Sequence, residues 1–229
     1  MALYRIAGLT VRMEAGGRTA RQAEPYRAAA CPGPADLAVS CDPARVMAQN
    51  PWIQDLDTAE YMGTGADFAR KLLGFDGLQL HAAAVELEGR AWLFSGPSGV
   101  GKSTMAGRWE RLLGARTLND DKPALRRLEG EWTAYGTPWS GKTDRSRPAG
   151  APLGGLAFLC RGEEYAALRL TPGEALPLLL SQLPLGLSRG RLERQLELAD
   201  RLLRENRIWK LLCRNEDESA LLAWEFMRK

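Results

Sequence analysis

The stretch that decides the fold is Ser95-Gly96-Pro97-Ser98-Gly99-Val100-Gly101-Lys102-Ser103-Thr104. It carries the G-x-x-x-x-G-K-S pattern that is typical of a phosphate-binding loop. The apolar run 91–94 comes before it, and residues that can start a helix, 104–109, come after it. Strand, glycine-rich loop and helix, in that order, form the context that the motif requires. The sequence therefore predicts an α/β fold in which this loop connects a buried strand to a helix.

The residues of this loop have expected roles in binding a nucleotide. Glycines let the backbone wrap a phosphate without side-chain clashes, and the N–H groups at the start of the helix attract the anion. Lys102 is expected to neutralise the outer phosphates, and the Ser103 hydroxyl is expected to hold Mg²⁺. The predicted nucleotide-binding residues are Gly96, Pro97, Ser98, Gly99, Val100, Gly101, Lys102, Ser103 and Thr104.

Length and charge limit the classes of protein to which the chain can belong. The 229 residues carry a formal net charge of +3, without a basic tract, so we expect no nucleic-acid partner. No apolar run reaches the roughly 18 residues that a membrane-spanning helix needs, so we expect no membrane partner. We expect one domain over 1–229, with a β-rich and helical N-terminal subregion at 1–74 and a nucleotide-binding core at 75–229.

The N-terminus and the cysteines favour a cytoplasmic protein. The first residues lack the basic and then apolar pattern of a signal peptide. Cys31, Cys41, Cys160 and Cys213 form no C-x-x-C pair that would indicate a metal site. Cys160 and Cys213 lie in apolar strand-like runs, and we expect both side chains to be buried.

The N-terminal subregion is expected to begin with a β-rich layer. Loose alternation predicts short strands at 3–6, 9–13 and 38–40, separated by turns at Gly16-Gly17 and Pro32-Gly33-Pro34. Residues 55–73 can form one or two helical stretches, which Gly63 and Gly65 are expected to interrupt and Gly74 to end.

The core is expected to begin with two strands, 78–87 and 91–94, joined by a tight turn at 88–90. A helix over 102–113 should end at Gly114. The capping box at Thr171 and Glu174 marks the start of another helix. The other expected elements are a strand at 116–118, a hairpin of 124–128 with 132–135, a loop at 136–142, strands at 156–160, 167–170 and 208–212, an amphipathic helix at 192–203, and a final helix that begins at about 217.

His81, Asp120 and Asp121 are candidate catalytic or metal-binding residues. His81 is the only histidine of the chain, and the predicted hairpin brings it close to the phosphate loop, where it could orient a carboxylate or share its proton. It could equally be a structural histidine at a strand end. The two acids follow a short strand, where one could hold Mg²⁺ and the other could accept the proton of a hydroxyl. The alternative is a solvated turn, since 119–123 is turn-like.

The loop at 136–145 supplies candidates for gripping the transferred phosphoryl group. Basic residues on such loops commonly clamp phosphoryl oxygens, and the candidates are Trp139, Ser140, Gly141, Lys142 and Arg145. The basic residues could instead belong to a solvated loop, and Trp139 could be a core anchor.

Together, His81, the 95–103 loop and the Asp120-Asp121 pair resemble the catalytic domain of HPr kinase/phosphorylase, mainly over residues 75–145. That family shares its fold with the nucleotide domain of phosphoenolpyruvate carboxykinase. The resemblance implies a P-loop kinase domain with a mixed β-sheet and flanking helices. It also implies that 96–103 binds the β- and γ-phosphates, that Ser103 and Asp121 hold Mg²⁺, and that Asp120 acts as the base with help from His81. Lys102 completes the implied catalytic set.

We therefore expect a kinase that uses ATP and Mg²⁺ and transfers the γ-phosphoryl group to a hydroxyl, such as a serine of a peptide, a protein or a small molecule. The chain has no clear copy of the family's basic C-terminal segment, so HPr itself is not the expected acceptor. One alternative is a non-catalytic ATP-binding regulatory module. Another is a carboxykinase-like enzyme, which would need a second metal site with a histidine ligand. Assembly into a homo-oligomer stays open.

Overall fold

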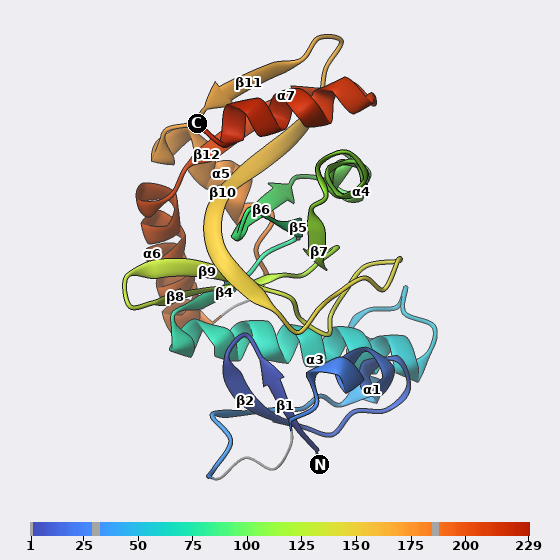
Figure 1. The fold of residues 1–229 in the computed structure, drawn as a ribbon. Helices are drawn as coiled ribbons and strands as arrows, with labels where there is room; N and C mark the ends of the chain where they lie inside the picture. Colours follow the sequence, from blue (N-terminus) through green and yellow to red (C-terminus); the bar gives the residue numbers. More distant parts are fainter. Residues whose placement is uncertain (1, 29–32, 185–187) are drawn as a thin grey trace.

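The computed structural model of the chain describes residues 2–28, 33–184 and 188–229, so that Cys31 and the first residue of the expected turn at 32–34 lie outside the described residues. The fold is mixed α/β, with mixed β-sheets and flanking helices (Figure 1). A small sheet lies at the end that holds the N-terminus, and a larger sheet forms the rest of the molecule. The long helix α3 lies between the two sheets in this view (Figure 1).

The small sheet confirms the predicted N-terminal strands: β1 (Ala2–Ile6) pairs antiparallel with β2 (Leu9–Met13), which pairs parallel with β3 (Leu37–Val39). The expectation of a β-rich layer alone was wrong, because this region also forms the helices α1 (Gly17–Ala23) and α2 (Pro43–Gln49). Gly16-Gly17 starts α1 instead of forming a turn. The carboxylates of Glu60 and Asp57 accept hydrogen bonds from the N–H groups of Gly16 and Arg18, each at 2.7 Å. These caps come from a distant part of the chain, so no local pattern indicates the helix.

Helix α3 (Leu56–Leu72) runs without a break through Gly63 and Gly65, so the predicted interruption was wrong. At Gly65 an added Cβ would lie 2.9 Å from Cδ1 of Trp139, and at Gly63 it would lie 2.8 Å from the Cβ of Cys41. The glycines therefore serve close packing rather than a bend. Helix α3 ends at Leu72, close to the predicted stop at Gly74, and a 3₁₀ turn over Leu73–Phe75 continues to Asp76, which has φ 54°.

The larger sheet has the strand order β4-β8-β9-β10-β6-β5-β7, with β12 added beside β10 and β11 beside β12. Strand β10 is bent: its first residues pair antiparallel with β9, and its later residues pair parallel with β6 and β12. The predicted strand at 78–87 divides in two at Leu80 and His81. The strands are β4 (Gly77–Gln79), β5 (Ala82–Leu87), β6 (Arg90–Ser95), β7 (Arg116–Asn119), β8 (Ala124–Leu128), β9 (Glu131–Tyr135), β10 (Gly150–Arg161), β11 (Ala166–Arg169) and β12 (Ile208–Cys213).

The two faces of the larger sheet are covered by different helices, because successive strand residues point to opposite sides. On one face, Leu93 and Phe158 pack with α5 (Pro172–Leu180) and α6 (Arg189–Glu205). On the other, an aromatic group packs with α4 (Lys102–Leu113) and α7 (Asp217–Met227). The aromatic group consists of Trp92, Phe94, Trp109 and Trp224. The predicted helix at 102–113, its end at Gly114 and the capping box at Thr171 are confirmed.

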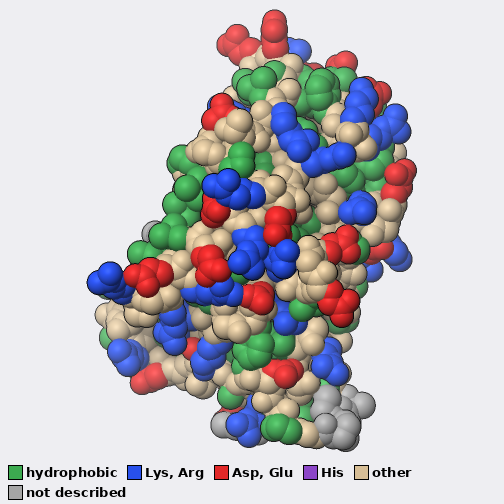
Figure 2. All heavy atoms as spheres, turned by 90° about the vertical axis from the view of Figure 1, so that its left-hand side faces the viewer, with side chains coloured by type: hydrophobic (Ala, Val, Ile, Leu, Met, Phe, Trp, Pro, Cys, Tyr) green, Lys and Arg blue, Asp and Glu red, His purple; other side chains and the backbone are tan. Residues whose placement is uncertain are grey.

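The surface on the α6 side mixes charges of both signs, as Figure 2 shows for the face on the left of Figure 1. Along α6 the ion pairs link residues three or four apart, such as Arg189 with Glu193 and Arg204 with Asp200.

Cys160 and Cys213 are half-buried, so the expectation that both side chains are buried was wrong. Burial raises the pKa of the Cys213 thiol to about 11. In the described part of the chain, no helix has the length and apolar composition needed to cross a membrane.

Candidate active site

The predicted phosphate loop connects β6 to α4 through glycines with positive φ. Gly96, Gly99 and Gly101 have φ angles of 137°, 77° and 113°. At Gly96 an added Cβ would lie 3.1 Å from the carbonyl oxygen of Leu159 in β10, so this glycine lets the loop pass close to the neighbouring strand. At Gly99 and Gly101 an added Cβ would meet no atom within 4 Å. The backbone at these two glycines therefore faces open space, and both glycines line the cavity described below.

Lys102 lies folded over this loop. Its side chain is almost completely buried, and Nζ donates hydrogen bonds to the carbonyl oxygens of Gly96 at 2.8 Å and Pro97 at 3.1 Å. Burial lowers the pKa of Lys102, against the opposing charge of Asp121. From the end of β10, Arg161 donates a hydrogen bond to the Gly99 carbonyl oxygen at 2.7 Å. We did not predict Arg161, although its place directly after a buried strand was a usable signal.

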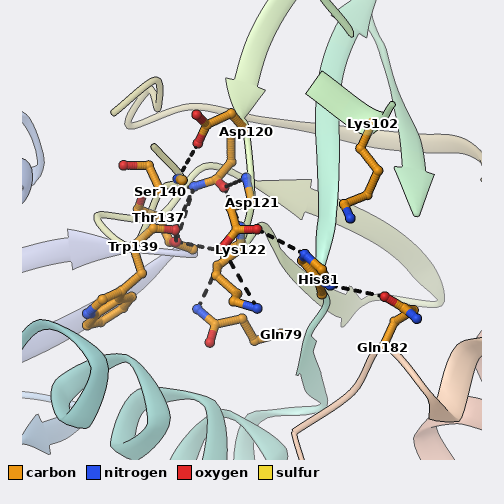
Figure 3. Close-up of polar contacts among 12 residues, drawn as sticks. Gln79, His81, Lys102, Asp120, Asp121, Lys122, Thr137, Trp139, Ser140 and Gln182 are labelled. Atoms are coloured by element: carbon orange, nitrogen blue, oxygen red, sulfur yellow. Dashed lines mark hydrogen bonds and ion pairs between the residues drawn. The ribbon is translucent and has the colours of Figure 1, made fainter. Parts of the chain in front are cut away.

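The acids after β7 diverge because Asn119 shapes the turn. The buried Oδ1 of Asn119 accepts hydrogen bonds from the N–H groups of Asp121 at 2.9 Å and Lys122 at 2.6 Å. This is an Asx-type turn, in which a short polar side chain replaces backbone partners. As a result, Asp120 and Asp121 reach different neighbours (Figure 3).

Asp121 contacts His81. The Oδ1 atom of Asp121 lies 3.2 Å from Nε2 of His81, and its Oδ2 lies 3.8 Å from Nζ of Lys122. Burial raises the pKa of the Asp121 carboxyl, but the hydrogen bond with His81 and the charges of Lys122 and Lys102 outweigh it, so the pKa lies below its ordinary value. His81 lies at the bend between β4 and β5, rather than within a strand as predicted. The predicted closeness to the loop strand holds, since Ser95 donates a hydrogen bond to the His81 carbonyl oxygen at 2.8 Å.

Asp120 is almost fully buried and holds the loop that follows β9. Its Oδ1 accepts a hydrogen bond from the N–H of Gly141 at 2.5 Å, and its Oδ2 accepts one from the hydroxyl of Thr143. The structure therefore brings His81 to Asp121 and not to Asp120, the acid that we expected His81 to assist. The difference arises from the turn at Asn119, which no spacing argument indicates.

Gln182 is a site residue that sequence reasoning missed. Its Oε1 lies 3.0 Å from Nδ1 of His81, and its backbone carbonyl accepts the His81 N–H at 3.0 Å (Figure 3). The residue follows α5, 101 positions after His81. At such a separation the sequence contains no signal that pairs the two.

The predicted clamp residues lie in three different places: in the core, along the cavity and away from it. Trp139 is 2% exposed and stacks on Phe68 with ring centroids 4.8 Å apart, so it is a core anchor that only borders the cavity. Ser140, Gly141 and Lys142 line the cavity. Arg145 is turned away, because it forms an ion pair with Glu110 at 2.6 Å beside a separate hollow.

A single cavity of about 900 Å³ joins these groups. One wall consists of the phosphate loop from Ser98 to Thr104, without Val100, together with His81, Gln182 and the two acids. The opposite wall comes from the N-terminal region and was not predicted. It contains Arg18, Thr58, Tyr61, Met62, Ala66 and Ala69. The guanidinium of Arg18 lies over the Tyr61 ring, 4.1 Å from its centroid, and Arg18 also donates a hydrogen bond to the Gly141 carbonyl oxygen at 2.8 Å.

The cavity provides oxygen donors that suit Mg²⁺. In the residues that the structure describes, no group of three or more His, Cys, Asp or Glu side chains is arranged to hold a metal ion unaided. The Ser103 hydroxyl and the Asp120 and Asp121 carboxylates nevertheless line the same cavity. Mg²⁺ at phosphate sites is held by one or two carboxylates together with the substrate phosphates and water, so this donor set fits the ion.

Comparisons with known proteins place the chain in no family. No known family matches it by sequence, and no curated protein does. Among solved structures, the HPr(Ser) kinase/phosphatase from Coxiella burnetii is similar at 10% sequence identity and a TM-score of 0.39, over 66% of this chain and 88% of that one. The likeness is therefore a distant structural similarity.

Proposed function

We propose that the chain is a P-loop kinase that uses ATP and Mg²⁺ to transfer the γ-phosphoryl group to a hydroxyl. The observation that carries the proposal is that Lys102, His81 and both acids line one cavity, although they come from separate elements. A phosphate loop alone would indicate nucleotide binding. Acids and a histidine beside the loop lysine add the groups that accept a proton during transfer.

In the proposed reaction, the bond between the γ-phosphorus and the bridging oxygen of ADP breaks, and a bond forms from the γ-phosphorus to the acceptor oxygen. The hydroxyl proton passes to Asp121, which His81 contacts at 3.2 Å. We assign this role to Asp121 rather than to Asp120, because both oxygens of Asp120 already accept hydrogen bonds from the 141–143 loop. Asp120 then keeps Gly141 and Lys142 in place along the cavity.

The nucleotide phosphates would lie on the N–H groups at the start of α4, opposite Gly99 and Gly101. Lys102 would leave the carbonyl oxygens of Gly96 and Pro97 and pair with the outer phosphates. Ser103 and a carboxylate of the Asp120-Asp121 pair would hold Mg²⁺, which offsets the negative charge of the phosphates when bound. The acceptor would enter between the acids and the α3 wall. A cytoplasmic location, where ATP is available, is part of the proposal.

The test is to incubate the full chain with γ-labelled ATP, Mg²⁺ and an extract of its host, and to identify what becomes labelled. We expect label on a hydroxyl-bearing peptide, protein or small molecule, and none with Lys102→Ala. Lys142→Ala is the matched control: it removes a lysine from the same cavity but not from the loop, so it should reduce the rate of transfer rather than abolish nucleotide binding.

Other outcomes would replace the proposal. Bound ATP that is never consumed, across a broad screen of hydroxyl acceptors, would indicate a regulatory module. Consumption that depends on an oxo acid would indicate a carboxykinase-like reaction. ATP that binds equally well to wild type and Lys102→Ala would contradict the assigned nucleotide site itself.

A further inference from the structure

Gln79 places an uncharged amide beside an apolar cluster. Its side chain is 6% exposed, and its neighbours Leu78 and Leu80 pack into the core on the other face of the strand. Because residues paired across antiparallel strands share a face, Gln79 lies on the side of Ala124, which packs in one cluster with Phe68 of α3. A polar group at such a position needs partners, since burying a donor or acceptor unpaired costs stability.

The described partners of this amide leave most of its hydrogen-bonding capacity open. Nε2 of Gln79 donates to the carbonyl oxygen of Lys122 at 3.4 Å, which is long for a hydrogen bond. Because a carbonyl can only accept, this contact keeps the amide nitrogen on the side of Lys122 (Figure 3). Within the described residues no group donates to Oε1 of Gln79, and this oxygen is not among the atoms sealed from solvent without a partner. Since Gln79 lines the cavity, its oxygen and its second N–H are open to a ligand there.

The rest of this side of the cavity offers room and few open charges. The α3 residues that line it include three with small or no side chains: Gly65, Ala66 and Ala69. Of the cavity's cations, Arg18 already pairs with Asp144 at 2.6 Å, and Lys122 lies 3.8 Å from Asp121. The amide of Gln79 is therefore the buried group on this side whose hydrogen-bonding positions are open.

The open positions of Gln79 select the kind of group that can meet them. An oxygen that accepts and an N–H that donates lie on one planar amide, so a second amide can satisfy both at once. A carboxylate has only acceptors and would place an oxygen against Oε1, whereas an ammonium has only donors and would face the N–H. A single hydroxyl reaches one of the two positions but not both.

We propose that Gln79 and the small residues of α3 form a subsite for the phosphoryl acceptor, and that this acceptor carries an uncharged amide beside its reactive hydroxyl. Gln79 is then a specificity-determining residue. The inference rests on the kinase function proposed above for the transfer step, but binding at the subsite can be measured without transfer. A peptide segment and a small molecule with an amide both present this group.

The direct test compares four two-carbon alcohols that differ in one group: glycolamide, glycolate, ethanolamine and ethylene glycol. Their binding to the full chain without nucleotide is measured by ligand-observed NMR. Glycolamide should bind about tenfold or more tightly than the other three, because each of them loses at least one hydrogen bond to Gln79. Tighter binding of glycolate or ethanolamine, or no binding of glycolamide, would overturn the proposal.

Gln79→Met removes the amide but keeps the length of the side chain. This variant should bind the four alcohols equally. Thermal unfolding of the chain without ligand should occur at the wild-type temperature or above, because the lost oxygen has no described donor. A lower unfolding temperature would show that the amide supports the fold, and a retained preference for glycolamide would place its site elsewhere; either result would overturn the proposal.

Two further variants sharpen this test. Gln195→Met is the matched control, since Gln195 is also a buried glutamine, 4% exposed, but does not line the cavity; it donates to the Pro184 carbonyl oxygen at 3.3 Å. It should keep the preference for glycolamide. Ala66→Leu fills the subsite from an exposed α3 position, so it should weaken glycolamide binding without unfolding the chain. Unchanged binding in Ala66→Leu would contradict the part assigned to α3.

Transfer assays with γ-labelled ATP separate this inference from the kinase function. Gln79→Met should lower kcat/KM for amide-bearing acceptors about tenfold or more and leave ATP binding unchanged. A blocked serine peptide that reacts much faster than glycolamide would identify a peptide acceptor, and equal rates would identify a small amide; both support the subsite. Weaker ATP binding in Gln79→Met would assign the amide to the nucleotide and overturn it. Glycolamide that binds, with no acceptor ever labelled, would reject the kinase function and leave the subsite standing.

Discussion

Asp120 and Asp121 are adjacent acids with the same charge, but they make different contacts in the cavity. Asp121 lies against His81, whereas the two oxygens of Asp120 each accept a hydrogen bond, from Gly141 and Thr143. We therefore expect substitution of Asp121 to affect proton transfer, and substitution of Asp120 to affect the stability of the loop that it holds.

Asp121→Asn should lower kcat by about 100-fold or more, because the amide cannot accept the hydroxyl proton. Its thermal stability should change little. Asp120→Asn should instead reduce stability by about 1–3 kcal/mol, because the neutral amide has a single acceptor oxygen in place of two charged ones for Gly141 and Thr143. Steady-state kinetics and denaturant unfolding of both variants check this. The reverse pattern, with Asp120→Asn stable but inactive, would return the proton-accepting role to Asp120.

Glu86 gives a prediction for stability against pH. It accepts hydrogen bonds from Arg147 at 2.7 Å and Arg116 at 3.2 Å. The hydrogen bond from Arg147 is the main cause that lowers the pKa of Glu86 below its ordinary 4.5. A carboxyl with a lowered folded-state pKa stabilises the fold above its unfolded-state pKa, and this contribution is lost as the pH falls through the folded-state value.

Glu86→Gln should therefore be less stable than wild type by about 1–2 kcal/mol at neutral pH. The difference should shrink steadily below the ordinary pKa of 4.5. Urea unfolding of both proteins over a pH series measures it. A difference that stays constant into acid would show that the loss comes from packing and not from the charge.

At the scale of elements, a helix, turn or loop could be predicted when the residues that determine it lie close together in the sequence. The phosphate loop, the helix end at Gly114 and the capping box at Thr171 each rest on residues a few positions apart. The structure confirms the helix end and the capping box, and it confirms that the glycine-rich loop connects a strand to a helix; its binding of phosphate stays a prediction. Helix α1 depends on caps from α3, and the bend at His81 depends on Gln182. Such features need the folded chain, so local patterns could not indicate them.

The continuity of α3 yields a prediction about its glycines. Gly65→Ala should destabilise the protein by about 1–3 kcal/mol, because the new methyl would press on the Trp139 ring at 2.9 Å. Gly107→Ala is the matched control in α4, where an added Cβ meets no atom within 4 Å. There the substitution should stabilise by about 0.5–1 kcal/mol, as alanine is the better helix former. Thermal unfolding of both variants tests the contrast, and equal shifts would contradict the packing argument.

At the scale of the whole molecule, the cavity is built from both ends of the fold. The larger sheet supplies the phosphate loop and the acids, while α3 and the residues around Arg18 supply the facing wall. The N-terminal region is thus part of the candidate site, and it lies on the side from which we propose that the acceptor enters.

Met62→Trp should fill part of the cavity from α3, where Met62 is 40% exposed and lines the wall. We expect the KM for the acceptor to rise about tenfold or more, since overfilling a pocket costs roughly 1–3 kcal/mol, with ATP affinity unchanged. Leu56→Trp, on an exposed α3 position that does not line the cavity, is the matched control and should leave both values unchanged. Binding and kinetic measurements on the two variants decide it. Weaker ATP binding in Met62→Trp would show that this wall receives the nucleotide instead.

The bend of β10 has a consequence for how the two halves of the larger sheet stay aligned. Its opening residues belong with β9, and its later ones lie between β6 and β12, so one continuous backbone joins both halves of the larger sheet (Figure 1). A chain opened at the Glu129-Gly130 turn would keep the lysine, the histidine and both acids on its first fragment. Strand β10, which pairs with the strands of both halves of the sheet, would lie on the second fragment. The first fragment would thus hold these candidate site residues, and the second would hold the strand that joins the two halves of the sheet. We expect the cavity to form again only when the two fragments associate.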